Sequence, residues 1–265
     1  MNIVKYKMLY VSLTCLPTRI DNIEYIFEWL LEQTMKPDKL IIHLPKKCIR
    51  LNMEYNIELI QEKINDHPLR DKIYLNITKD YGPITKIYPL IHLDFIKDDD
   101  MIIIVDDDNY YNPHLIETLV ETFKGNQEKY AICLSGLRYP TQLNSIYMCI
   151  MSGTDCDIME GAFGYIVRRS FLQEDLTDWV IDVDSELEIN LNHYTYSFVS
   201  DDYLISRYLD KHGILKFVLP PDDNIHKDTC FVNKNMKNDN ALNLLGNNLN
   251  GYVYSEIELK NKGLI

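Results

Sequence analysis

The chain has 265 residues, of which 46 % are hydrophobic, and it carries a formal net charge of −13 at pH 7. This length is enough for one large α/β domain or two small ones. The negative charge argues against non-specific binding to nucleic acid or to anionic lipid, because phosphates of the same sign repel it. An anionic ligand would still bind such a chain where a divalent cation lies between the two.

Cysteine usage and hydropathy indicate the compartment. The six cysteines are scattered and form no CxxC pair, which predicts reduced core thiols and no structural zinc site. No apolar run reaches the length of a membrane span, and the amino-terminal run is too short for a signal peptide. We therefore expect no membrane insertion and a cytoplasmic location, whereas the sequence does not indicate an oligomeric state.

The first half of the chain alternates apolar runs with segments of helical periodicity. The strands are predicted at residues 7–13, 39–44, 72–77 and 101–105. The helices are predicted at residues 21–33, with Asp21 as N-cap, at 53–64, from Gly82-Pro83 onward, and from Asn112-Pro113 to Gly125.

This alternation predicts an α/β fold whose mostly parallel sheet is covered by helices on both faces. Ligands of such sheets bind beyond the carboxyl ends of the strands, which selects the loops at residues 14–21, 78–86 and 106–112. The second half is less regular, with strands predicted at 130–137 and 165–168 and a helix at 200–212 that Gly213 ends.

Three aspartates, Asp106, Asp107 and Asp108, follow the apolar strand 101–105 directly. Adjacent carboxylates repel one another, so a positive group is expected beside them. Because alternate side chains of a strand share a face, Asp106 and Asp108 could converge on Mg²⁺ or Mn²⁺. The alternative is a solvated acidic turn. We interpret the other acidic run, residues 98–100, as such a turn, at the opposite end of the sheet.

A family resemblance appears at this point. The stretch IIIVDDDNYYNPHLIETLVETF resembles the DxD region of the GT-A fold glycosyltransferases, in particular the exostosin-like transferase domains and the small transferases of large algal and amoebal viruses. The resemblance implies the GT-A (Rossmann-like) fold, with Asp106 and Asp108 holding the metal and Asp107 contacting the donor ribose or sugar. A viral origin would place the protein in the host cytoplasm.

The first of the other two loops resembles the family's first nucleotide-binding loop, a strand that ends in Thr-x-x-Pro-x-Arg. Here Thr14, Pro17 and Arg19 occupy that pattern, and Arg19 could pair with a phosphate or the base edge. The alternative is a helix-entry loop with an exposed arginine.

The loop at residues 78–86 resembles a DYGPxTK pattern of the viral-type transferases, which implies that Asp80 and Tyr81 contact the nucleotide base. Gly82 allows the backbone to approach a ligand closely, and the start of the following helix favours an anion. Lys86 lies one turn later, where it can reach a diphosphate. A strand–helix turn with a solvated lysine is the alternative.

A glycosyl transfer that inverts configuration needs a carboxylate base for the acceptor hydroxyl. Asp201 and Asp202 open the predicted helix at 200–212, a place where GT-A enzymes often carry an acidic pair, and the resemblance makes Asp202 the base and Asp201 the second candidate. The alternative is structural, because Ser200 is a good N-cap and acidic residues in a first turn are favoured by the helix dipole alone.

Residues that contact the acceptor, and one further metal ligand, are expected in the second half of the chain. Glu160, Gly161 and Phe163 resemble the small-residue segment that flanks the acceptor site, with Phe163 available to stack on a pyranose. Trp179 either lines the acceptor cleft or is an ordinary core or surface residue. His226 resembles the additional metal ligand that many GT-A enzymes supply near the carboxyl terminus; otherwise it is a polar loop residue.

These features predict a catalytic domain at residues 1–232, made of a nucleotide-sugar half (1–125) and an acceptor half (126–232), and a polar extension at 233–265. The leading hypothesis is a Mn²⁺- or Mg²⁺-dependent hexosyl- or deoxyhexosyltransferase that moves a sugar from a UDP-type donor to a glycan or glycoprotein acceptor. Inversion is favoured, although the exostosin-like enzymes retain. One alternative is a sugar-phosphate nucleotidyltransferase, whose first loop is normally rich in glycine, whereas residues 12–21 contain none. The other is a catalytically silent sugar- or partner-binding module.

Overall fold

The structure, a computed structural model, describes residues 7–138, 148–150, 153–180, 200–219, 230–232 and 248–265. Its centre is an eight-stranded sheet of order β11-β14-β8-β13-β6-β1-β2-β5. The strands are β1 (Leu9–Thr14), β2 (Lys39–Pro45), β5 (Ile73–Thr78), β6 (Met101–Ile104), β8 (Ala131–Cys133), β11 (Thr154–Asp155), β13 (Tyr165–Arg168) and β14 (Lys216–Val218). Only β13 and β11 run against the other strands of this sheet, so the predicted mostly parallel architecture is confirmed.

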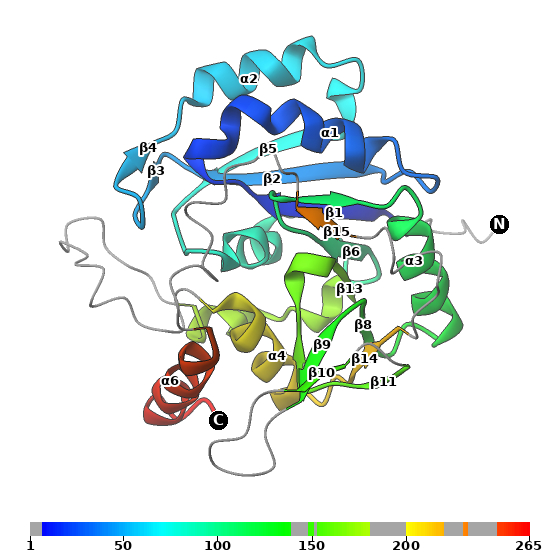
Figure 1. Ribbon diagram of the computed structural model, residues 1–265, viewed down its shortest axis with the longest axis vertical. Helices are drawn as coiled ribbons and strands as arrows, with labels where there is room; N and C mark the ends of the chain where they lie inside the picture. The colour runs from blue at the N-terminus through cyan, green and yellow to red at the C-terminus, as the bar shows by residue number, and fades with distance from the viewer. Residues whose placement is uncertain (1–6, 139–147, 151–152, 181–199, 220–229, 233–247) are drawn as a thin grey trace.

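Helices cover both faces of the sheet, as predicted. Figure 1 shows α1 (Ile23–Leu31) and α2 (Ile57–Asp66) together over the β1, β2 and β5 part, and α3 (Leu115–Gly125) beside β8 and β13. α4 (Asp201–Lys211) and α6 (Asn248–Asn261) lie on the opposite side of the molecule, where they contact each other. In the described ranges, every helix is too short or too polar to span a bilayer.

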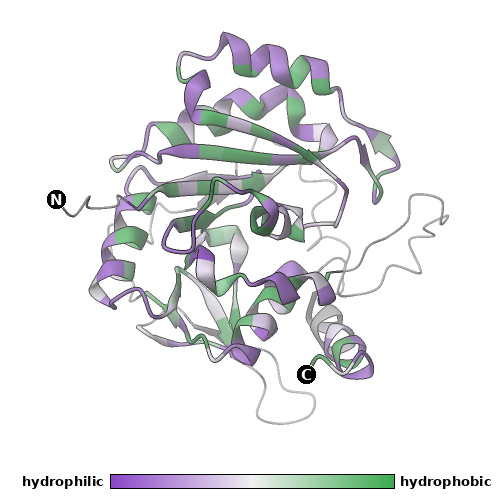
Figure 2. Ribbon diagram, turned by 180° about the vertical axis from the view of Figure 1, so that it is seen from behind, coloured by the Kyte–Doolittle hydropathy of each residue, from purple (hydrophilic) through white to green (hydrophobic). Residues whose placement is uncertain are grey.

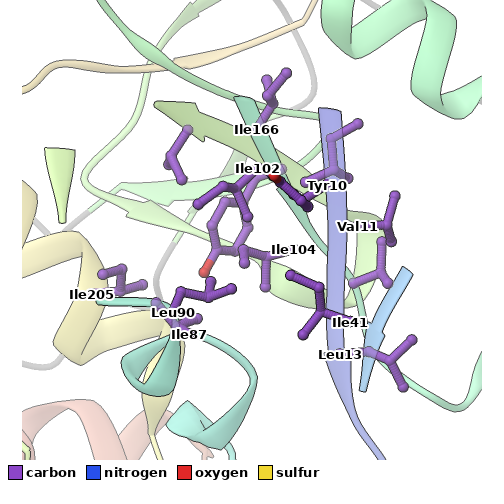
Figure 3. Close-up of a cluster of buried hydrophobic side chains, with 14 of the residues drawn as sticks. Tyr10, Val11, Leu13, Ile41, Ile87, Leu90, Ile102, Ile104, Ile166 and Ile205 are labelled. Carbon is purple, nitrogen blue, oxygen red and sulfur yellow. The ribbon is translucent and has the colours of Figure 1, made fainter. Parts of the chain in front are cut away.

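The core lies between these layers. Figure 3 shows Ile102 and Ile104 of β6 beside Ile87 and Leu90, with Ile205 of α4 approaching from the same side. All five side chains are fully buried. The strands are largely hydrophobic along their length, whereas the outward faces of the helices are hydrophilic (Figure 2). The continuous apolar run of β6 is thus explained by burial on both faces of the sheet.

Three smaller sheets border the main one. They consist of β10 (Met148–Ile150), β9 (Gly136–Arg138) and β12 (Ile158–Met159); of β15 (Cys230–Val232) and β7 (Asn109–Tyr111); and of β3 (Lys47–Cys48) and β4 (Met53–Glu54). The run predicted as one strand at 130–137 is therefore divided between β8 and β9, and the helix predicted from residue 53 begins only after Asn56.

The segment that follows Gly82-Pro83 is not the predicted α-helix. It forms two short 3-10 turns, η3 (Ile84–Lys86) and η4 (Tyr88–His92), with hydrogen bonds such as Ile87 N to the carbonyl of Ile84 at 2.8 Å. Pro89 explains the difference, because a proline lacks the N–H that a continuing helix needs and its ring clashes with the preceding turn. The favourable helix dipole expected beside Lys86 is therefore much reduced.

The acidic run before β6 also differs from the prediction of a solvated turn. Asp100 is buried and accepts hydrogen bonds from the backbone amides of Met8 and Lys97, at 2.9 and 2.7 Å. Asp99, by contrast, is exposed, with Arg168 at 3.7 Å. This run therefore joins the starts of β1 and β6 through one buried carboxylate.

Candidate functional site

Three strand ends meet at the carboxyl edge of the parallel part of the sheet (Figure 1). Thr14 is the last residue of β1, and Pro17 is the first residue of η1 (Pro17–Asn22), the 3-10 turn that follows. Asp106 comes two residues after the end of β6, and its neighbour Val105 is fully buried. The three predicted loops are therefore brought together by the parallel order of β5, β2, β1 and β6.

The ammonium group of Lys86 lies at the centre of this site. Its Nζ is 2.5 Å from Asp106 Oδ1 and 2.7 Å from Asp201 Oδ2, and its side chain is only 4 % exposed. Ser12 Oγ donates to the carbonyl of Lys86 at 2.6 Å, which fixes the lysine backbone against β1. Burial opposes the charge on Lys86, but Asp106, Asp201 and Asp202 outweigh it and raise its pKa well above the ordinary value.

Arg19 and Asp107 join the first loop to the end of β6. Arg19 Nη1 is paired with Asp107 Oδ1, and Arg19 Nη2 lies 3.1 Å from Asp108 Oδ2. The other oxygen of Asp107 accepts a hydrogen bond from the Leu16 amide at 2.9 Å. Both side chains are almost wholly buried, so Arg19 is not the exposed residue that the alternative interpretation expected. Their roles toward donor phosphate and ribose stay predictions.

Asp106 and Asp108 are the accessible members of the triplet, with side chains 29 % and 20 % exposed. Burial and the charges of Asp106 and Asp107 raise the pKa of Asp108 to about 6, although Arg19 and Lys86 act in the opposite direction. The site thus holds more negative charge than its two cations neutralise locally. In the described part of the chain, no three His, Cys, Asp or Glu side chains are grouped so as to hold a metal ion.

Asp201 and Asp202 reach the same site from the first turn of α4, and they differ in their contacts. Asp201 is buried, and its Oδ2 makes an electrostatic contact with Lys86 without an aligned hydrogen bond. Asp202 is less buried, and its Oδ1 accepts a hydrogen bond from the Gly161 amide at 2.9 Å. Burial, and next the charge of Asp201, raise the pKa of Asp202 well above the ordinary value. Ser200 precedes the helix but makes no side-chain capping bond.

Gly161 fits closely between the two halves of the site. A Cβ at this position would lie 2.8 Å from Asp202 Oδ1 and 3.2 Å from Lys86 Nζ. Glu160 beside it accepts a hydrogen bond from Ser135 Oγ at 2.5 Å, and Phe163 is half-buried against the core. The absence of a side chain at Gly161 therefore leaves room for Lys86 and Asp202, whereas its place beside an acceptor stays a prediction.

Trp179 does not line the surface of this site. Its side chain is fully buried, with its ring 5.5 Å from that of Tyr208 on α4 and the Lys211 ammonium 5.4 Å from its ring centroid. Of the two interpretations of this residue, the structure supports the core one and corrects the acceptor-lining one. His226, the expected additional metal ligand, lies outside the described residues.

The loop of Asp80 is held by the carboxylate of that residue, which accepts from backbone amides. Asp80 accepts hydrogen bonds from the amides of Ile49 and Gly82, at 2.6 and 2.8 Å, and Gly82 has a φ of 71°, which favours glycine. The Tyr81 ring packs edge-on against that of Tyr88, with centroids 4.8 Å apart. Asp80 thus shapes the loop, whereas its predicted contact with a nucleotide base stays untested.

Two residues that the sequence interpretation missed connect the triplet to the Gly161 segment. Asn109 Nδ2 donates to the carbonyl of Ala162 at 2.9 Å and lies 3.2 Å from Asp108 Oδ1. The Tyr111 hydroxyl accepts from the Asp106 amide at 2.8 Å and lies 3.2 Å from the same Ala162 carbonyl. Both are buried, on one face of β7, so their alternate spacing directly after the triplet is the signal that could have identified them.

Comparisons with known proteins find similarity only to solved structures, at low sequence identity. No protein-family model and no curated protein matches it. Among solved structures, it is similar to a 4-diphosphocytidyl-2C-methyl-D-erythritol synthase, with 10 % identity, a TM-score of 0.47, and coverage of 84 % of this chain and 92 % of that one.

Two further solved structures share 13 % identity with the chain, and each match covers 82 % of it. A mannosyltransferase from Pyrobaculum calidifontis, in complex with GDP-Man and Mn²⁺, has a TM-score of 0.48, and the chain spans 56 % of that protein's length. A Francisella tularensis 2-C-methyl-D-erythritol 4-phosphate cytidylyltransferase has a TM-score of 0.41 with 90 % of its chain covered.

Proposed function

We propose that this protein is a metal-dependent glycosyltransferase that moves a sugar from a nucleoside-diphosphate donor to a glycan acceptor. The observation that carries the proposal is the meeting of Asp106 and Asp201 on the buried ammonium of Lys86 at the carboxyl edge of the parallel strands, with Lys86 Nζ 2.5 Å from Asp106 Oδ1 and 2.7 Å from Asp201 Oδ2. Carboxylates and a buried cation at that edge suit a ligand that brings both a diphosphate and a divalent cation.

The carboxylates of Asp106 and Asp108 fit a hard cation such as Mn²⁺ or Mg²⁺. Mg²⁺ in phosphate-transfer sites is commonly held by one or two protein carboxylates and completed by water and substrate phosphate. Two accessible carboxylates therefore suffice, and a third protein ligand is not required. A cation bound there would stabilise the negative charge of the departing nucleoside diphosphate.

Asp202 is the proposed general base, with Asp201 as the second candidate. A base works best when its pKa lies near the working pH, and the pKa of Asp202 is raised from the ordinary carboxylate value by burial and by Asp201. Asp202 is also the less buried of the pair, and it adjoins Gly161, in the segment expected to flank the acceptor. It would take the acceptor hydroxyl proton in an inverting transfer; anomeric NMR of the product distinguishes inversion from retention.

The finer parts of the proposal concern the two substrates. UDP is the proposed nucleotide, and Thr14, Arg19, Asp80 and Tyr81 belong to the loops that would contact it. A glycan or glycoprotein would bind on the side of Glu160, Gly161 and Phe163. Arg19 supports this arrangement indirectly, because its ion pairs with Asp107 and Asp108 hold the first loop beside the triplet.

The test is Asp108→Ala, measured by calorimetry of UDP and GDP binding with and without Mn²⁺ and by transfer to a glycan panel. We expect the variant to lose the Mn²⁺-dependent part of nucleotide binding and to lose transfer, because one of two carboxylate ligands is gone. Asp99→Asn is the matched control, since Asp99 belongs to the acidic run at the opposite end of β6 and is 62 % exposed. Nucleotide binding in Asp108→Ala equal to that of the control would refute the proposal, and release of pyrophosphate from a nucleoside triphosphate would favour nucleotidyl transfer instead.

A further inference from the structure

A single ammonium group serves both halves of the site. Lys86 Nζ contacts Asp106 just after β6 and Asp201 at the start of α4. A Cβ added to Gly161 would lie 3.2 Å from the same ammonium, so the glycine leaves room for it. Ser12 of β1 holds the lysine backbone. Carboxylates from two distant parts of the chain therefore converge on one buried positive charge, while β1 holds the backbone of the same lysine.

We propose that Lys86 is a resident counter-cation, which competes with a divalent ion for Asp106 and thereby couples cation binding to nucleotide binding. The inference rests on the proposed function. In this role Lys86 is more than a contact to phosphate, because it already acts in the protein that has bound no nucleotide.

The competition follows from the charges. Asp106 Oδ1 is 2.5 Å from the ammonium, so a divalent ion that uses Asp106 weakens an ion pair that is already formed. The ammonium cannot escape into water, since its side chain is 4 % exposed, and it would be left beside the divalent ion with Asp201 as its close partner. A cation alone therefore binds against repulsion and against the loss of a buried pair.

A nucleoside diphosphate changes this balance. Its phosphates bring negative charge to the loop that carries Lys86, so the ammonium gains a new partner when the divalent ion takes Asp106. Cation and nucleotide then each bind more tightly when the other is bound. This effect through Lys86 adds to that of the direct contact between the two ligands. Because linkage is reciprocal, the same factor appears in the affinity of either ligand when the other is added.

The experiment measures the dissociation constant of Mn²⁺ by calorimetry, alone and in the presence of saturating UDP, for wild type and Lys86→Met. Methionine approximates the length of the lysine stem without the charge. We expect Lys86→Met to bind Mn²⁺ alone about tenfold more tightly than wild type does, and the tightening caused by UDP to shrink by about tenfold. GDP in a parallel series covers the other nucleotide.

Two further variants make the result decisive. Lys46→Met removes an exposed lysine just after β2, at the same edge of the sheet, and is expected to leave both constants within about twofold of wild type. Lys86→Met combined with Asp201→Asn removes one charge of each sign, and it replaces the single variant if unfolding experiments show that Lys86→Met does not fold. An increase in Mn²⁺ affinity over wild type is expected in the double variant too, smaller than in Lys86→Met because the attraction of Asp201 for the ion is also removed.

The outcomes separate this inference from the proposed function. If wild type and Asp108→Ala bind UDP equally with Mn²⁺, the proposed function fails. If Asp108→Ala loses that binding but the Lys86 variants bind Mn²⁺ alone no more tightly than Lys46→Met, only the coupling role of Lys86 is overturned. Tighter Mn²⁺ binding together with a smaller effect of UDP supports it.

Discussion

Gly161 shows how closely single residues are fitted at this site. Its amide holds Asp202, and the smallest side chain would place a carbon 2.8 Å from the Asp202 carboxylate oxygen. Gly161→Ala should therefore displace Asp202 or Lys86, and a displacement of about 1 Å in a catalytic group can lower a rate by about a hundredfold. We expect transfer to fall by about that factor, with a loss of roughly 1–3 kcal/mol in the free energy of unfolding from overpacking.

Gly125→Ala is the control for this substitution. Gly125 ends α3, and a Cβ there meets nothing within 4 Å, so we expect unchanged transfer and a stability within about 1 kcal/mol of wild type. Initial rates and urea unfolding, measured on both variants, make the comparison. Equal activity in the two variants would show that Gly161 has no special place in the reaction.

The residues of the site were predictable to different degrees. Asp106 and Asp108 stand out because an apolar strand runs directly into them, and Lys86 because it follows a glycine-containing loop. Their pairing was not predictable, since the contact between Lys86 and Asp201 joins residues that are far apart in sequence and on separate elements. Nor does any local pattern reveal that Arg19 turns inward to Asp107.

At the scale of elements, α2 and α4 begin in different ways. Asn56 caps α2 through its Oδ1, which accepts from the Leu59 amide at 3.0 Å. Ser200 occupies the same position before α4, but its buried hydroxyl has no hydrogen-bond partner in the described residues. Loss of a working N-cap costs about 1 kcal/mol, so Asn56→Ala should lower the free energy of unfolding by that amount.

Ser200→Ala should change that free energy by less than about 0.5 kcal/mol, because no capping bond is lost. Urea denaturation of the two variants at pH 7.5 makes this comparison directly. A cost for Ser200→Ala as large as that for Asn56→Ala would mean that the serine hydroxyl caps α4 after all. Asp201 and Asp202 favour the start of α4 instead, because negative charges suit the first turn of a helix.

Whether a helix or strand was predicted correctly also depended on whether local sequence or distant contacts determine it. β1, β2, β5 and β6 were each predicted to within a few residues from their apolar runs. In β6 the run is continuous because the strand is buried on both faces, whereas the edge strand β5 is partly exposed. The short strand β7 was missed, since its three residues pair with β15, more than a hundred residues later. The turns η3 and η4 were mistaken for a helix because Gly82-Pro83 is a good helix start, and this signal was given more weight than Pro89.

At the scale of the whole molecule, one of the titratable side chains that the sheet buries away from the site is a histidine. His43 lies in β2, fully buried, with Asn76 Nδ2 2.9 Å from its Nδ1, a contact that a neutral imidazole satisfies by accepting. Burial lowers the pKa of His43 from 6.5 to about 3. Since the unfolded chain binds this proton near pH 6.5 and the folded chain only near pH 3, stability is full above pH 6.5 and falls as the pH decreases through that window.

The expected effect is a loss of about 1.4 kcal/mol in the free energy of unfolding between pH 7.5 and pH 5.5 from His43 alone, one pKa unit being worth 1.36 kcal/mol. His43→Asn removes the titration, so its unfolding free energy should depend less on pH by that amount, even if asparagine lowers stability at every pH. Urea denaturation at the two pH values measures the difference, with His114→Asn, at an exposed side chain, as the control. If His43→Asn and wild type lose the same free energy on acidification, His43 must already bind its proton in the folded sheet, and its burial does not set the acid sensitivity of the fold.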